Sequence, residues 1–486
     1  MFGITVGLVL SFSLSNVHAA AIFSRQQPPA QLACTEVQTL VTGGVSFSGS
    51  LQYDYDISHW SNASSLPATC TVEPASTEQI QDLVGVIATT RTPWAVKGAG
   101  HCNNNNMSST EGLLISMTNF RDITLSDDKS TVKVGMGLTW IEVYSALAPE
   151  GLVVVGGRYG PVGVAGLSLS SGYSWYTNEY GFATDNVVSY DIVLPDGTFT
   201  TVTKESNADL FFALQGGVNN FGIVVNIELK IHPLNDVFAG VVAVTGDLTA
   251  AIEATANYAE KTTDPKATVA SIVGASNGTA AMTIMIFYDD ATQPEGLFDE
   301  FLAIPGASVD VKTRTYLEFL ALGEIAVEPT NRATWYSAPI LSWPQELIEF
   351  IHDQAIEYST RIQSRSGTQV TGNVEPFLQE AYGHGGESAW PHDTSKPFNT
   401  FNGLFVWEDP EDDEFMIQLT IEYHTKVWDK AIELGVSSKD AYFPPNYSQS
   451  STPVEQIYGP NLDRLRSIKA SVDPLDIISL TGGFKI

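Results

Sequence analysis

One segment of the chain joins a glycine-rich turn to a side chain that can act as a base, a ligand or a point of covalent attachment. Residues 93–97 have the composition of a short strand, and they lead through the turn 98–100 to His101. Glycine has no Cβ, so backbone N–H groups at such a turn can come close to an anion. The polar run 103–106 follows shortly after. Taken alone, this pattern fits either an anion-binding turn or a plain one.

Two further glycine-rich stretches favour the ligand-binding interpretation. Residues 156–172 contain six glycines, and residues 214–222 have the same character. Glycine loses more conformational entropy on folding than any other residue, so six in one core segment would be costly without a purpose. Backbone packed closely against a flat or phosphorylated ligand would provide one. A tight loop in an irregular sheet is the alternative.

The elements that must position these turns can be read from local patterns. Helical spacing covers residues 77–88, with Ser76 as the expected N-cap, and residues 138–147. Residues 187–194 and 198–202 flank Pro195-Asp196-Gly197 and predict a hairpin. Further strands are expected at 93–97, 113–117, 131–134 and 223–231, and a helix at 208–214. The pattern predicts an α+β fold and disfavours a regular Rossmann domain.

The character of the chain changes near Phe238. Longer strand-like runs, 269–273 and 282–288, are followed by an amphipathic helix at 344–358. These runs predict a second domain with an antiparallel sheet and helices on one face. The last segment carries aromatic and proline residues, then a helix at 461–471.

Charge and composition limit the function classes. The chain has 486 residues, 43% of them hydrophobic, and a formal net charge of −31. Such acidity argues against nucleic acid or an anionic membrane as a partner. Two or three structural units are expected at this length. The eight histidines show no spacing typical of a metal site, so no metal is expected.

The N-terminus predicts secretion. Residues 1–20 carry no charged side chain, and an apolar stretch at 4–14 leads to small residues at 19–21. This pattern is typical of a secretory signal peptide, although the usual leading Lys or Arg is absent. No later stretch has the roughly 18 uninterrupted apolar residues that a membrane span needs.

The cysteines and sequons fit that compartment. Three cysteines allow one disulfide, for which Cys34 and Cys70 are the expected pair, because a bridge at Cys102 would disturb the turn beside it. Sequons for N-glycosylation begin at Asn62, Asn106, Asn277 and Asn446. Asn62 and Asn277 lie in the more loop-like contexts.

Five segments, taken in order, resemble a known family. They are KGAGH, GGRYGPVGVAG, YGFATDNVVSYDIVLPDG, ADLFFALQGGVNNFGIV and the terminal IYGPNLDRLRSIKASVDP. Together they are similar to the FAD-linked oxidases of the berberine-bridge-enzyme type, in the vanillyl-alcohol-oxidase or PCMH-type flavoprotein superfamily. The resemblance implies a bilobed FAD-binding domain at 66–236 and a substrate domain at 237–439. It also implies a C-terminal segment at 440–486 that returns to the FAD lobe.

The same resemblance implies FAD as the cofactor, bonded covalently to His101. It places the pyrophosphate beside the turn at 98–100 and the loop at 103–106. The residues expected to hold the cofactor are His101, Lys97, Gly98, Ala99, Gly100, Asn103, Gly157, Val162, Gly163, Gly166, Gly172, Asn186, Gly222 and Asn446.

Two departures from the family pattern matter. Members with two covalent links carry a cysteine at the position of Tyr159, so a single link through His101 is expected here. Family members that oxidise sugar chains often use both links, so the departure favours smaller, more apolar substrates. Leu167 stands where many relatives have a histidine.

A tyrosine is the expected catalytic base, because relatives take a substrate proton with a tyrosine or a carboxylate while hydride leaves to flavin. Tyr447 matches an Asn-Tyr pair of the family, and Tyr442 competes with it. An ordinary phenol titrates near ~10, so either would need a lowered pKa. Packed aromatic residues are the alternative interpretation. His384, His392 and Trp390 are candidates for the substrate side or for ordinary loop and core positions.

The resulting expectation is a secreted FAD-dependent oxidase that acts on a small organic substrate of specialised metabolism and returns electrons to O₂ as H₂O₂. Carbohydrate oxidase is the first alternative, and a flavin-binding protein of low turnover is the second. The sequence leaves the substrate and the oligomeric state open.

Overall fold

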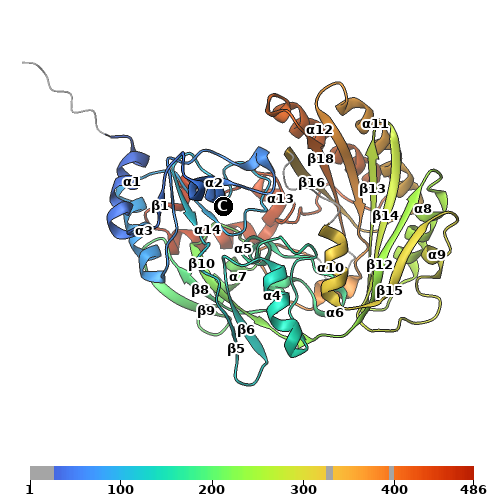
Figure 1. Ribbon diagram of the computed structural model, residues 1–486, viewed down its shortest axis with the longest axis horizontal. Coiled ribbons are helices and arrows are strands. Elements are labelled where there is room, and N and C mark those ends of the chain that lie inside the picture. The colour runs from blue at the N-terminus through green and yellow to red at the C-terminus, as the bar shows by residue number, and fades with distance from the viewer. Residues whose placement is uncertain (1–26, 325–331, 393–398) are drawn as a thin grey trace, which may run out of the picture.

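The protein folds into two lobes that lie side by side (Figure 1). The computed structural model describes residues 27–324, 332–392 and 399–486. The expected signal peptide at 1–20 therefore lies outside the described residues. Within the described ranges, no helix combines the length and the apolar character that crossing a membrane requires.

A four-stranded sheet supports the His101 turn. Its order is β1-β2-β4-β3, in which β2, β4 and β3 are parallel and β1 pairs antiparallel to β2. The strands are β1 (Val45–Ser46), β2 (Cys70–Val72), β3 (Trp94–Lys97) and β4 (Leu113–Ser116). Helices α1 (Pro29–Leu40) and α3 (Thr77–Thr90) pack on each other beside it, and α2 (Leu51–Ile57) contacts β2 and β4. A disulfide between Cys34 and Cys70 joins α1 to β2 and confirms the expected pair.

A five-stranded antiparallel sheet forms the second half of this lobe. Its order is β5-β6-β10-β8-β9. The strands are β5 (Ile123–Leu125), β6 (Thr131–Gly135), β8 (Val187–Val193), β9 (Phe199–Thr203) and β10 (Ile223–Lys230). The predicted hairpin is confirmed, because β8 pairs antiparallel with β9. The remaining elements are α4 (Trp140–Leu147), β7 (Leu152–Val153), α5 (Val164–Ser170), α6 (Thr177–Tyr180), α7 (Ala208–Leu214) and β11 (His232–Pro233).

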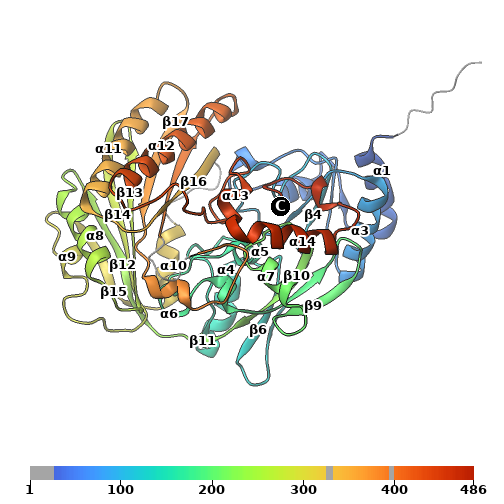
Figure 2. The same ribbon diagram turned by 180° about the vertical axis from the view of Figure 1, so that it is seen from behind.

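The other lobe is built on a seven-stranded antiparallel sheet of order β15-β12-β14-β13-β17-β18-β16. Its strands are β12 (Val237–Thr245), β13 (Ala267–Ser276), β14 (Thr279–Tyr288), β15 (Ser308–Arg314), β16 (Arg332–Ile340), β17 (Gly367–Val374) and β18 (Asn399–Trp407). The outer face is covered by α8 (Thr249–Lys261), α9 (Asp299–Leu302), α11 (Gln345–Ile362) and α12 (Asp413–Glu433) (Figures 1 and 2). Helix α10 (Tyr316–Glu324) lies on the side of the first lobe and contacts α4. The predicted α+β class is confirmed.

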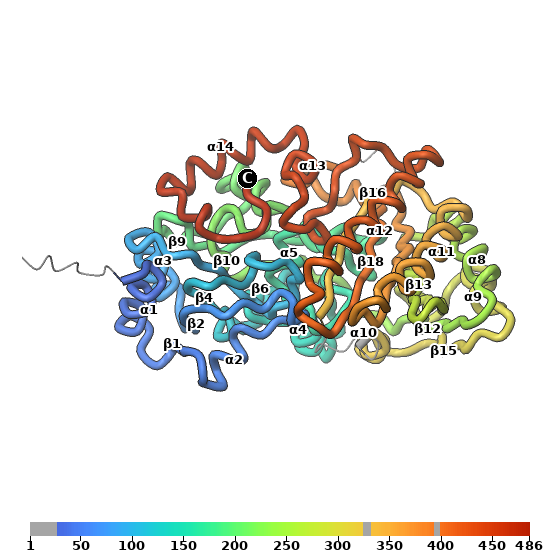
Figure 3. Tube along the Cα trace, turned by 90° about the horizontal axis from the view of Figure 1, so that it is seen from above, coloured from blue at the N-terminus to red at the C-terminus, as the bar shows by residue number. Residues whose placement is uncertain are grey.

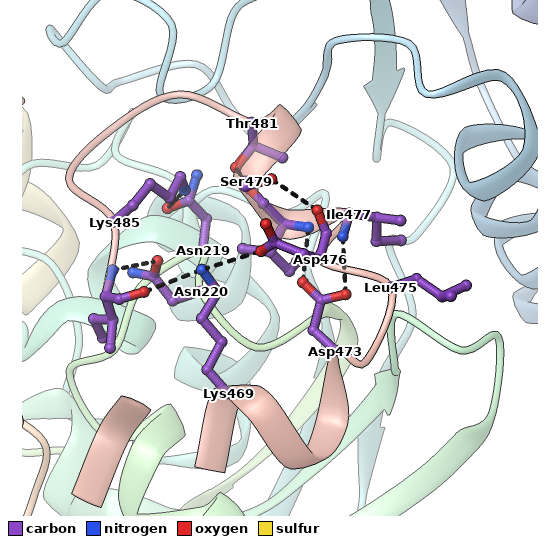
Figure 4. A network of polar contacts seen from close by, with 12 residues as sticks. Asn219, Asn220, Lys469, Asp473, Leu475, Asp476, Ile477, Ser479, Thr481 and Lys485 are labelled. Atoms are coloured by element: carbon purple, nitrogen blue, oxygen red, sulfur yellow. Dashed lines mark hydrogen bonds and ion pairs between the residues drawn. The ribbon is translucent and has the colours of Figure 1, made fainter. Parts of the chain in front are cut away.

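The C-terminal segment lies along the first lobe (Figure 3). Its helices are α13 (Val454–Tyr458) and α14 (Leu462–Val472), and α14 contacts α7. The chain end is fastened by hydrogen bonds (Figure 4): Lys485 Nζ donates to Asn219 Oδ1 at 3.0 Å, and Lys469 Nζ donates to the Ile486 carbonyl at 3.0 Å. Polar contacts thus hold the last residues against the loop that follows α7.

Two carboxyl groups meet at the seam between the lobes. Glu179 lies on α6 and Asp289 directly follows β14. Each keeps one buried oxygen without a hydrogen-bond partner among the described residues. Burial, followed by the charge of Asp289, raises the pKa of Glu179 to about 7, and burial raises the pKa of Asp289. The folded protein therefore favours a proton bound to this pair of carboxyl groups.

This pair predicts a loss of stability as pH rises. The folded pKa of Glu179 lies above its ordinary value of 4.5, so the folded state binds the extra proton between about pH 4.5 and pH 7. Its contribution to stability is fully present below that window and falls as pH rises through it. Glu179→Gln should flatten the fall in the thermal unfolding midpoint between pH 4.5 and pH 8, whereas Glu150→Gln, at an exposed position, should not. Equal slopes for both variants would contradict the assignment.

Candidate functional site

The His101 side chain sits where β3 leaves its sheet. Gly100 has a φ of 77°, which an L side chain adopts only under strain, and a Cβ there would lie 3.1 Å from the Ser58 carbonyl. The His101 ring stacks on Trp60 at 4.9 Å and meets the edge of Tyr159 at 5.7 Å. Its Nε2 is buried and has no hydrogen-bond partner within the part of the chain that the structure describes. Burial lowers the pKa of His101 to about 4, so the imidazole is neutral at physiological pH and keeps a lone pair available for bonding.

The loop after His101 is tied to the C-terminal segment. Asn104 Nδ2 donates to the Ser448 carbonyl at 2.9 Å, and Asn104 Oδ1 accepts from the Ser450 N–H at 2.9 Å. Asn103 Nδ2 is buried and unpaired within the described ranges. Among the described residues, His101 Nε2 and Asn103 Nδ2 are therefore two buried nitrogens without a protein partner, which is unusual for polar groups in a folded protein.

The glycine-rich segment 156–166 packs against this turn. A Cβ on Gly163 would lie 2.9 Å from the Ala99 Cβ, so the two backbones approach too closely for a larger residue. A Cβ on Gly157 would lie 2.6 Å from the Trp140 ring, which fills the space beneath the segment. A Cβ on Gly166 would meet no atom within 4 Å. The segment therefore combines close backbone packing on one side with open space at Gly166.

A buried ionic network lies beside the same segment. Arg158 Nη1 pairs with Glu375 Oε1 at 2.7 Å, with side chains 15% and 7% exposed. Arg158 Nη2 donates to the Tyr447 hydroxyl at 3.2 Å. Glu375 also accepts from Asn402 Nδ2 at 2.9 Å, so both of its oxygens are engaged. Burial raises the pKa of Tyr447 to about 12, while the Arg158 charge lowers it and the Glu375 charge raises it. The pKa of Tyr447 is thus raised, contrary to the lowered value expected for a base, because burial outweighs the opposing effect of the Arg158 charge.

Asn446 fixes the position of Tyr447. Its Oδ1 accepts from the Gly172 N–H at 2.9 Å and from the Ser171 hydroxyl. Gly172 has a φ of 83°, and a Cβ there would clash with Ala183 and Leu167 at 2.6 Å. The Tyr447 ring stacks on Tyr173 at 6.0 Å. One short segment, 446–450, thus contacts both the loop after His101 and the turn after α5.

Four of the sequence-predicted residues have other surroundings. Lys97 Nζ donates to the Tyr55 carbonyl at 3.0 Å, close to Asp56 and Glu73, and burial lowers its pKa to about 8. The Asn186 amide bonds to the carbonyls of Tyr180 and Phe182 and to His232 Nε2. A Cβ on Gly222 would lie 2.6 Å from the Val193 carbonyl, which indicates a packing requirement in the sheet. Tyr442 lies against Gly459, at the edge of the same aromatic cluster as Tyr447.

The histidines and the tryptophan predicted near the substrate side are placed differently from one another. His384 is exposed and packs against the turn at Gly181. Trp390 is buried against Phe182, and both ring nitrogens of His392 face backbone carbonyls, those of Trp390 and Tyr382. For Trp390 and His392 the core interpretation fits the contacts better. No group of three or more His, Cys, Asp or Glu with metal-binding geometry occurs in the described residues.

The sequence reasoning missed Arg158, Glu375, Trp60 and Trp335. Arg158 is a charged residue inside a glycine-rich stretch, and this unusual position could have indicated a role in the site. Glu375 and the two tryptophans had no local signal, because their partners lie in distant segments.

Two family models match the chain. The model described as "FAD binding domain" matches residues 68–203, and the model described as "Berberine and berberine like" matches residues 439–478. The first range contains His101 and the glycine-rich segment. The second contains Tyr442, Asn446 and Tyr447.

Relatives and solved structures agree with these matches. An uncharacterized FAD-linked oxidoreductase of Arthroderma benhamiae is 33% identical over 330 residues, which are 66% of this chain and 64% of the relative. An FAD-dependent monooxygenase of Penicillium roqueforti is 27% identical over 99% of this chain and 98% of its own.

Solved structures share the fold. The 6-hydroxy-D-nicotine oxidase of Arthrobacter nicotinovorans gives a TM-score of 0.75 at 18% identity, covering 91% of this chain and 98% of the other. The xylooligosaccharide oxidase of Myceliophthora thermophila gives 0.74 at 20% identity, covering 92% and 98%.

The structure agrees with FAD as the cofactor. The two unpaired buried nitrogens, the close backbone packing around Ala99 and the open space at Gly166 suit a large, flat, phosphorylated ligand. With the family matches, this indicates an FAD-linked oxidoreductase that carries an FAD-binding domain at 68–203 and a berberine-like segment at 439–478.

Proposed function

We propose that this protein is a secreted oxidase that removes hydride from a C–H bond next to oxygen or nitrogen in a small organic substrate. Bound FAD supplies the hydride acceptor and a route for both electrons to O₂, which leaves as H₂O₂. The observation that carries the proposal is the contact between Arg158 and the Tyr447 hydroxyl, within an ionic network beside the flavin-binding turn.

Tyr447 is the proposed proton acceptor. A phenolate receives a proton from the substrate hydroxyl or amine as hydride departs, and the charge of Arg158 stabilises that phenolate. Asn446 holds the segment at the Gly172 turn, so Tyr447 is oriented by backbone contacts on both sides. Tyr442 makes no ion-pair or guanidinium contact of this kind with the described residues and is the second candidate.

A single covalent link through His101 is proposed for the cofactor. The neutral, buried imidazole supports this role. Tyr159, at the position of the second linking residue in other members, presents a ring to His101. Cys34 and Cys70 are joined to each other, and the Cys102 thiol contacts Met107 Sδ at 3.4 Å. Thus none of the three cysteines offers a second link.

The remaining parts of the proposal concern compartment and organisation. Residues 1–20 are proposed as the signal peptide, with the FAD domain at 66–236, the substrate domain at 237–439 and the final segment at 440–486. The disulfide supports an oxidising compartment. Asn277 is the proposed glycan site, because it is exposed in the turn between β13 and β14, whereas the Asn446 side chain is engaged.

Substrate class is proposed from the lining. The rings of Tyr173, Tyr447 and Phe377 pack together beside Arg158, and such an aromatic cluster suits a small, partly apolar compound. Oxidation of a carbohydrate is the second candidate, supported by the shared fold of the xylooligosaccharide oxidase of Myceliophthora thermophila.

The first test uses the purified secreted protein. We expect a yellow protein whose colour stays with the acid-precipitated pellet, with one flavin-modified peptide containing His101. We also expect H₂O₂ release with a member of a panel of small alcohols, amines and oligosaccharides. A colourless protein would favour a binding protein without flavin, and turnover of oligosaccharides alone would favour the carbohydrate alternative.

A further inference from the structure

Residues 59–61 connect the His101 loop to the other lobe. They precede the range 68–203 that the FAD-binding model matches. The backbone N–H of Trp60 donates to the Gly100 carbonyl at 2.9 Å, and His59 Nε2 lies 2.9 Å from the Ser108 hydroxyl. Towards the other lobe, Ser61 exchanges two hydrogen bonds with Ala333 of β16, at 2.7 and 2.9 Å. This short segment is therefore fastened at both ends.

The Trp60 ring is stacked with two other rings. One contact is with His101, at 4.9 Å and 22° between planes, and the other is with Trp335 of β16, at 6.0 Å and 28°. The indole N–H of Trp60 is buried and has no hydrogen-bond partner in the described ranges. The Trp60 side chain therefore interacts with His101 and Trp335 through its ring.

The His101 ring has few other constraints on its orientation. Its Nε2 makes no hydrogen bond to the described residues, and its remaining ring contact is the edge of Tyr159. The χ2 angle of histidine has a broad distribution, so ring orientation is normally set by contacts or hydrogen bonds. A stacked ring fixes the imidazole plane without occupying a nitrogen lone pair. This suits a nitrogen that must form a bond.

We propose that Trp60 is a positioning residue for covalent flavin attachment, holding the His101 ring in the plane needed for bonding, with Trp335 supporting it from the other lobe. The proposal rests on the single link through His101 proposed above. In the net reaction a C–N bond forms between the imidazole nitrogen and the flavin 8α carbon. One C–H and one N–H bond break, and their two protons and two electrons reduce O₂ to H₂O₂.

The contact of Trp60 with Trp335 also links flavin attachment to the other lobe. Trp335 and Ala333 belong to the edge strand of the seven-stranded sheet, so the Trp60 ring is in place only when the lobes are packed together. Attachment should therefore depend on an assembled second lobe. Trp335→Ala is expected to slow attachment less than Trp60→Ala, because it removes support and not the stacked ring itself.

The test follows the rate of attachment. Full-length protein from a riboflavin-starved host is mixed with FAD, and acid-stable flavin is measured over time alongside total bound flavin. Trp60→Ala should slow acid-stable incorporation about two- to tenfold, the range that one ring-stacking contact gives, with total binding near wild type. Trp60→Phe keeps a stacking ring and should restore most of the rate.

A matched control separates positioning from general destabilisation. Trp428 lies on α12 in the other lobe and meets Phe443 edge-on at 5.3 Å, so Trp428→Ala removes a partly buried tryptophan from the same protein. It should leave the attachment rate unchanged. An unchanged rate in Trp60→Ala, or an equal loss in Trp428→Ala, would overturn the positioning role alone. Wild-type protein that binds FAD and releases all of it in acid would overturn the His101 link and this inference together.

Discussion

His101→Ala protein is expected to release all of its flavin on acid precipitation, while wild type retains its flavin in the pellet. Among the described residues, the His101 imidazole combines a neutral state with a buried, unpaired ring nitrogen at the proposed flavin-binding turn. The close backbone packing at Ala99 and Gly163 remains in the variant, so some FAD should still bind without a covalent bond. Substrate oxidation should slow, because in this family loss of the link usually lowers the flavin potential. The measurement is the visible spectrum of pellet and supernatant.

Cys102→Ala provides the matched control for this experiment. It changes the neighbouring residue, whose thiol contacts Met107, without touching the imidazole. Its flavin should stay with the pellet. If His101→Ala kept its flavin in the pellet and its full activity, the central assignment of the cofactor link would be wrong.

Tyr447→Phe is expected to lower kcat by about 10²- to 10⁴-fold, the range typical for loss of a general base, with flavin content unchanged. The substitution removes the hydroxyl that accepts from Arg158 and keeps the ring that stacks on Tyr173. Steady-state H₂O₂ release and anaerobic flavin bleaching by substrate would both report the loss. Tyr442→Phe should retain activity. The reverse outcome for the two variants would transfer the base role to Tyr442.

The pH profile gives an independent reading of the same base. Burial raises the pKa of Tyr447 to about 12 and Arg158 lowers it, so the active phenolate becomes more abundant as pH rises. We expect kcat/KM to increase towards alkaline pH. Removing Arg158 alone would leave Glu375 buried without its cation, so the suitable variant is Arg158→Met with Glu375→Gln.

In that double variant Tyr447 loses both the cation that lowers its pKa and the anion that raises it. The Arg158 charge acts on the pKa of Tyr447 more strongly than the Glu375 charge does, so the alkaline limb should move to higher pH and activity at pH 8 should fall. A limb that stays in place would show that Arg158 does not set the proton affinity of the base.

Much of the fold follows from local sequence. Ser76 caps α3 as expected, because its hydroxyl accepts from the Gln79 N–H, and Pro195-Asp196-Gly197 closes the hairpin between β8 and β9. The long strands β13 and β14 follow from their β-rich runs, although both extend beyond the predicted limits. These features depend on residues close together in sequence, so propensity and turn chemistry suffice to predict them.

Candidate site residues were predictable where backbone conformation is the requirement. Gly100 and Gly172 have positive φ values, and Gly163 lies too close to Ala99 for a side chain. A positive φ or a close backbone approach requires glycine, so these positions can be recognised from the sequence. Lys97 shows the limit, because its place beside His101 in sequence does not reveal that its ammonium points to the Tyr55 carbonyl.

The tertiary structure alone decided which distant side chains meet. Arg158 and Tyr447 are 289 positions apart, and Ser61 and Ala333 are 272 apart. Their contacts depend on how two lobes pack and on the order of strands in a seven-stranded sheet, neither of which is encoded in local periodicity. The sequence by itself therefore determined the glycine-rich turns proposed to bind flavin and the resemblance to FAD-linked oxidases. The guanidinium beside Tyr447 and the ring behind His101 arise from packing, because burial and orientation of a side chain depend on every element around it.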